Sequence, residues 1–114
     1  MTSDDKDEAT AELRALLRAA HDLREVAERA EAGLTTLAFA GVAHPQRNVW
    51  IDTDLAGRIA IDLEDFAVAG EWDNAVARVA ADDAAAAVAT VRAWLGGADV
   101  DAAIAAAHGH VQRR

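Results

Sequence analysis

The chain has 114 residues, which fits one domain with a modest core. Its formal charge is −9, from 11 basic and 20 acidic residues, so its field repels nucleic acid and anionic membranes and attracts basic partners. It has no cysteine, which excludes disulfides, thiolate nucleophiles and cysteine-ligated zinc. We expect a soluble, cytoplasmic protein that forms a single domain over 1–114, with frayed ends at about 1–6 and 108–114.

The segment Asp5–Ala32 predicts a long N-terminal helix that ends at Gly33. Its apolar stripe consists of Leu13, Leu16, Leu17, Ala20, Leu23, Ala27 and Ala30. Oppositely charged residues four apart support the helix: Arg18 with Asp22, Arg24 with Glu28, and Glu25 with Arg29. The stripe fits a helix that lies on a sheet, and it also fits a seam between two copies of the chain.

The segment Val49–Asp65 predicts a β-hairpin, because aliphatic and polar residues alternate along both of its halves. A three-residue loop that ends at Gly57 would set the register. In that register Ile51 lies opposite Ile61 on a dry face, and Trp50 lies opposite Asp62 on a wet face.

The remaining segments complete a fold of the α+β class in two layers. Leu34–Ala43 predicts a strand, and Trp72–Ala81 is interpreted as a further strand, although a continuous helix to Leu95 also fits. A helix capped at Asp82 or Asp83 would end at Gly96-Gly97, and Asp99–Ala107 would form a last short helix. We therefore expect a long N-terminal helix, an antiparallel sheet of three to four strands, and one or two C-terminal helices.

The wet face of the hairpin is the candidate site, because an exposed tryptophan beside carboxylates has the composition of a protein interface. Trp50 would be the anchor of this face unless the terminal helix covers it. The candidate partner-binding residues are Trp50, Asp52, Asp54, Asp62 and Glu64, with Asp65 and Glu71 at the rim.

The residues that common catalytic sites require are scarce. Ser3 is the only serine and Lys6 the only lysine, and the chain has no glycine-rich phosphate loop. The hairpin aspartates could hold a divalent cation, but a flat strand face lacks the wrapping loop of tight calcium sites. His108 and His110 offer only two ligands in a tail. We expect a protein that is not an enzyme and that binds no metal and no cofactor.

Three stretches, IDLED (61–65), WDNAVARV (72–79) and VRAWLGG (91–97), resemble small proteins of bacteria with GC-rich genomes. Some of these are similar to acidic immunity-type proteins of polymorphic toxin systems. The resemblance implies a binding protein that neutralises a basic toxin, such as a nuclease or a nucleic-acid deaminase, by occluding its active site. The alternative function is a homodimeric assembly module that uses the N-terminal helix, and a metal-dependent enzyme is a third.

Overall fold

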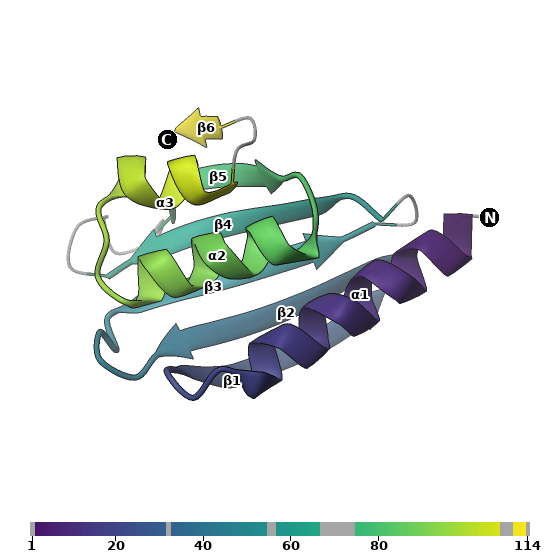
Figure 1. Ribbon diagram of the computed structural model, residues 1–114, viewed down its shortest axis with the longest axis horizontal. Coiled ribbons are helices and arrows are strands. Elements are labelled where there is room, and N and C mark those ends of the chain that lie inside the picture. The colour runs from purple at the N-terminus through teal and green to yellow at the C-terminus, as the bar shows by residue number, and fades with distance from the viewer. Residues whose placement is uncertain (1, 32, 55–56, 67–74, 108–110, 114) are drawn as a thin grey trace.

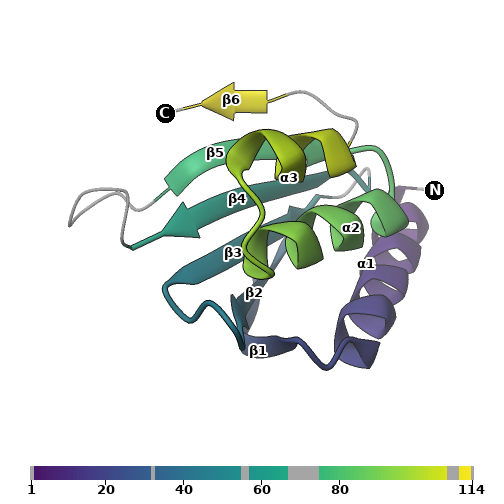
Figure 2. The ribbon, with the colours of Figure 1, turned by 60° about the vertical axis from the view of Figure 1, so that its left-hand side comes forward.

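The protein folds into two layers, with helices on one face of an antiparallel sheet (Figures 1 and 2). The computed structural model describes residues 2–31, 33–54, 57–66, 75–107 and 111–113. Within these ranges the sheet has the strand order β1-β2-β3-β4-β5-β6, so strands that follow one another in the chain also lie side by side. The class α+β was predicted, but the length of the first helix and the number of strands were not.

The elements follow the chain in one order, and the last strand is much shorter than the other five. They are α1 (Thr2–Ala19), β1 (Leu23–Glu31), β2 (Leu34–Gly41), β3 (Arg47–Thr53), β4 (Ile59–Asp65), β5 (Ala75–Ala81), α2 (Ala84–Leu95), α3 (Val100–Ala107) and β6 (Val111–Arg113). The stretches expected to be frayed therefore contain the start of α1 and the whole of β6, whereas 108–110 lie outside the described residues.

The prediction of a helix to Ala32 and a sheet of three to four strands was wrong. The helix ends at Ala19, and Leu23–Glu31 pairs with β2 as an edge strand that contains a bulge between Glu25 and Ala27. Gly33 does not end a helix. It has a φ of 80°, in the left-handed region, and it lies in the tight turn between β1 and β2.

The charges that suggested one helix instead connect α1 to β1. Arg14 forms an ion pair with Glu28, and Arg18 donates hydrogen bonds to Glu25 at 3.1 and 3.2 Å. Arg92 of α2 pairs with Asp22 at 3.3 Å. Spacing in sequence favoured helical pairs because Arg18, Asp22, Glu25 and Glu28 each also have a residue of opposite charge four positions away in the chain.

The predicted hairpin is confirmed. Ile51 pairs with Ile61 and Trp50 pairs with Asp62 in the register expected from the alternation, and Gly57 has a φ of 77°. The interpretation of a strand after the hairpin is also confirmed for Ala75–Ala81, while Trp72 lies outside the described residues.

The C-terminal helices begin where the sequence predicted. The Asp83 carboxylate accepts a hydrogen bond from the Ala86 amide at 2.8 Å, and the Asp99 carboxylate accepts one from the Ala102 amide at 2.8 Å.

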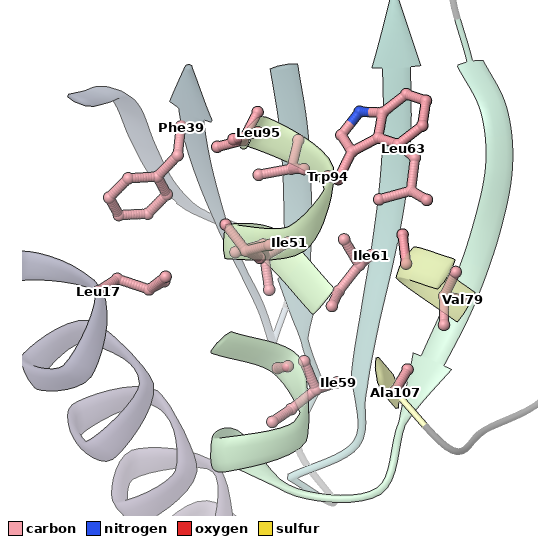
Figure 3. Packing of buried hydrophobic residues seen from close by; sticks show 14 of the residues in the cluster. Leu17, Phe39, Ile51, Ile59, Ile61, Leu63, Val79, Trp94, Leu95 and Ala107 are labelled. Carbon is pink, nitrogen blue, oxygen red and sulfur yellow. The ribbon is translucent and has the colours of Figure 1, made fainter. Parts of the chain in front are cut away.

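The core lies between the sheet and the helices (Figure 3). Every second residue of the central strands points into it: Leu37, Phe39, Val49, Ile51, Ile61, Leu63, Ala77 and Val79, all at most 1 % exposed. The helices cover these residues with Leu13, Leu17, Val91, Trp94, Leu95, Ala103 and Ala107. Because α2 and α3 contribute many alanines, their backbones can approach the sheet closely.

One buried cation connects the hairpin to the end of α2. Arg47 of β3 donates through Nε to the Asp65 carboxylate of β4 at 3.0 Å, with side chains 15 % and 3 % exposed. Its Nη1 donates to the carbonyls of Trp94 at 2.9 Å and Ala98 at 2.5 Å. The guanidinium also lies 3.8 Å from the centroid of the Trp94 ring, a cation–π contact.

These contacts show that the expectation of Asp65 at the rim of the interface was wrong. Asp65 shares its parity with Ile61 and Leu63, so it points toward the helices, where Arg47 compensates its charge. A positive charge beside the last carbonyls of α2 also complements the negative end of the helix dipole.

Replacing Arg47 should strongly destabilise the fold. Arg47→Met leaves the Asp65 carboxylate buried without its cation, so urea unfolding should show a loss of about 3–5 kcal/mol. The matched control is Arg58→Met, because Arg58 forms an ion pair with Asp54 but is 82 % exposed. The control should lose less than about 1 kcal/mol. Equal losses in the two variants would contradict the role given to the buried pair.

Candidate protein-binding face

The face of the sheet opposite the helices carries the candidate site, and we call it the open face. The strands alternate between the two faces, so its residues are those that point away from the core. It consists of Leu34, Thr36, Ala38, Ala40, Asn48, Trp50, Asp52, Ala60, Asp62, Glu64, Arg78 and Ala80. In the described part of the chain, α1, α2 and α3 all lie on the other side (Figure 2).

Trp50 lies near the middle of the open face and is 37 % exposed. Its indole Nε1 donates a hydrogen bond to the Glu64 carboxylate at 2.8 Å. The alternative in which the terminal helix covers Trp50 is excluded, because α3 packs on the opposite side of the sheet. The ring is therefore held by a partner on the next strand while part of its surface stays accessible.

Two aspartates of the open face share one arginine. Arg78 donates to Asp62 at 2.8 Å and to Asp52 at 3.3 Å, and Asp52 also accepts from the Thr36 hydroxyl at 2.8 Å. Partial burial lowers the pKa of Arg78, but the hydrogen bonds and charges of Asp62 and Asp52 outweigh this and raise it overall. The arginine thus stays charged, and one polar network extends from β2 to β5.

Asp54 lies at the end of β3, where the chain turns into the hairpin loop. Its carboxylate accepts from the Arg58 backbone amide at 3.0 Å and from Arg58 Nε at 2.8 Å. The four carboxylates predicted on this face, those of Asp52, Asp54, Asp62 and Glu64, therefore each have a donor within the chain. They are fixed in position, and the arginines partly neutralise their charge.

Exposed apolar side chains extend the open face beyond Trp50. Leu34 is 38 % exposed, Val42 62 % and Phe66 50 %. Val42 follows β2 and Phe66 follows β4, and their amides continue the strand pairing by donating to Asp22 and Gln46 at 3.2 and 3.0 Å. Alternation therefore places both on the side of Trp50. A tryptophan, three aliphatic or aromatic residues and intervening alanines give this face an apolar component.

The sequence predicted Trp50 and its carboxylates on this face, whereas Leu34, Val42, Phe66 and Arg78 were not predicted. The signal for Leu34 and Val42 was present, since both have the parity of Thr36 and Ala38 in β2. Glu71, predicted at the rim, lies outside the described residues.

Other kinds of site find no support in the described ranges. Histidine, aspartate and glutamate side chains there form no group of three or more that could hold a metal ion. The helices in the same ranges are too short or too polar to cross a membrane. Comparison of the chain with family models, curated proteins and solved structures finds no match. The resemblance to immunity-type proteins stays a prediction.

Removing the central cation should weaken the network that crosses the open face. Arg78→Gln leaves Asp52 and Asp62 without their shared cation, so we expect a loss of about 1 kcal/mol in urea unfolding at low salt. Added salt should reduce this loss, because it screens repulsion between the two carboxylates. Arg29→Gln is the control, because Arg29 is 72 % exposed and its Nε lies 3.9 Å from the Glu31 carboxylate, which is a long and exposed ion pair. A loss of the same size in the control would contradict the assignment.

Proposed function

We propose that this protein binds another protein through the open face. We further propose that it is an immunity protein whose partner is a basic toxin, a nuclease or a nucleic-acid deaminase, with its active site occluded in the complex. The observation that carries the proposal is Trp50, which is accessible and held by Glu64 among fixed carboxylates.

The internal hydrogen bonds of the open face favour binding, because they set the positions of its charges before a partner arrives. Arg78 holds Asp52 and Asp62 in place, and the Asp52 carboxylate can accept more hydrogen bonds than it receives here. Ordering side chains costs free energy when two proteins associate. The carboxylates of this face are already ordered by their internal hydrogen bonds, so less of that cost remains. Lysine and arginine side chains of a partner would find acceptors at defined spacings.

The charge of the whole chain supports a basic partner at longer range. A net charge of −9 attracts a positively charged surface and speeds its approach. The open face itself carries both signs, because Arg78 lies among its aspartates. The overall charge therefore favours encounter, whereas the alternating charges on the face favour one orientation of the bound partner.

The alternative of a dimer through the N-terminal helix has less support. Leu13 and Leu17 of the predicted stripe are at most 1 % exposed within the chain's own core, and Leu16 is 40 % exposed. Leu23 belongs to β1 and not to the helix. The apolar surface that a helix seam would need is mostly used inside the molecule.

Co-expression with the product of the neighbouring gene tests the function directly. We expect a stable complex and relief of toxicity, and Trp50→Asp should weaken the complex by about 2 kcal/mol or more, as for an interface anchor. Leu16→Asp is the matched control, because Leu16 is equally exposed but lies on α1, on the helix side of the sheet. Absence of a partner and of any protective effect would refute the immunity proposal, and equal weakening by the control would refute the open face.

Association should also depend on salt. If the net charge of −9 guides the encounter, the association rate should fall by about tenfold or more between low and physiological salt, with a much smaller change in the dissociation rate. Surface plasmon resonance or stopped-flow measurements with the purified pair would show this. A salt-independent association rate would contradict the electrostatic part of the proposal.

A further inference from the structure

We propose that a depression at one end of the open face, beside Leu34, binds a single arginine side chain of the partner. This inference rests on the proposed function, since it names the partner residue that the face would receive. The depression has a volume of about 260 Å³ and is lined by Leu34, Asp52, Asp54, Arg58, Ile59, Ala60, Arg78 and Ala80.

A pair of small residues creates this depression. Ala60 of β4 lies directly opposite Ala80 of β5 on the open face. Larger side chains surround them, with Asp52 opposite Ala60 on β3 and Arg78 two residues before Ala80. Two adjacent methyl groups leave space that longer side chains would fill, so the sheet surface is hollowed at this point.

The lining suits an amphipathic cation. Leu34 and the two alanines offer an apolar surface for a methylene stem, as arginine requires when only its head stays polar. Asp52 and Asp54 supply carboxylates at the rim for the guanidinium. A purely apolar side chain would contact Leu34 and the alanines but not the carboxylates, whereas an arginine side chain would contact both.

Arg58 of the chain itself already binds one carboxylate of this site, and a partner could displace it easily. Arg58 binds Asp54 through Nε at 2.8 Å, yet its side chain is 82 % exposed. Exposed pairs of this kind contribute little to stability, so a partner's guanidinium can replace it at low cost. Arg78 does not oppose the arrival strongly, because its charge is balanced by Asp62 at 2.8 Å.

The site can be tested without the partner. The probe is N-acetyl-arginine amide, titrated into the ¹⁵N-labelled full chain and followed by amide chemical shifts. We expect saturable shifts at Leu34, Asp54, Ala60 and Ala80. The citrulline analogue has the same shape but no charge, and it should not produce them. Equal shifts with the two probes, or none with the arginine probe, would overturn the proposal.

Two substitutions sharpen the test. Ala80→Leu fills the depression from an exposed position and should weaken probe binding by about tenfold, because the stem loses its contact surface. Arg58→Gln removes the competing guanidinium and should strengthen binding by about threefold. Unchanged binding in Ala80→Leu, or weaker or unchanged binding in Arg58→Gln, would place the probe elsewhere and refute the site.

The outcome separates this inference from the proposed function. If the probe fails to bind while a complex forms that depends on Trp50, the arginine site is wrong and the function stands. If the probe binds as expected but co-expression yields neither partner nor protection, the immunity proposal is wrong and the site stands.

Discussion

The contact of Arg47 with Asp65 and Trp94 is the interaction on which the arrangement of the molecule depends. It joins β3, β4 and the end of α2 at one point, since the guanidinium binds the carboxylate, stacks on the indole and donates hydrogen bonds to two carbonyls. Trp94 adds a hydrogen bond from its Nε1 to the Glu64 carbonyl at 3.1 Å. The helix layer is thereby fixed on one side of the hairpin. Because Trp94 and its neighbours are directed to that side, the opposite side of the same two strands keeps its polar side chains accessible.

The same alternation along β3 and β4 therefore produces two sides with different environments, one buried and one in contact with solvent. On the helix side, aliphatic residues exclude water, and the buried Asp65 carboxylate needs a cation. On the open face, the carboxylates share Arg78, Thr36 and Trp50 as donors and keep contact with solvent. The open face is thus hydrated, yet its internal hydrogen bonds keep its charged side chains ordered.

The sequence alone allowed prediction of the elements whose signals are local. The register of the hairpin followed from parity and from Gly57, and the start of α2 followed from Asp83 as a capping residue. The strand β1 could not be found this way, because its charges also satisfy helical spacing and its partner β2 is what selects the extended form. The prediction for Asp65 was wrong because its charge suggested a solvent-exposed position, whereas its parity with Ile61 and Leu63 places it on the helix side. The depression beside Leu34 needs residues of β2, β3, β4 and β5 together, so no local pattern could indicate it.

The bulge in β1 has a consequence for how this sheet behaves in a crowded solution. A border strand with regular geometry offers its free amides and carbonyls to any extended chain and so invites polymerisation. In β1 the ladder is interrupted between Glu25 and Ala27, and charged side chains occupy much of its length. Stacking of further strands onto this border would have to accommodate the irregular spacing and remove water from charged side chains. Lateral growth of the sheet is thus discouraged by the same strand that completes it.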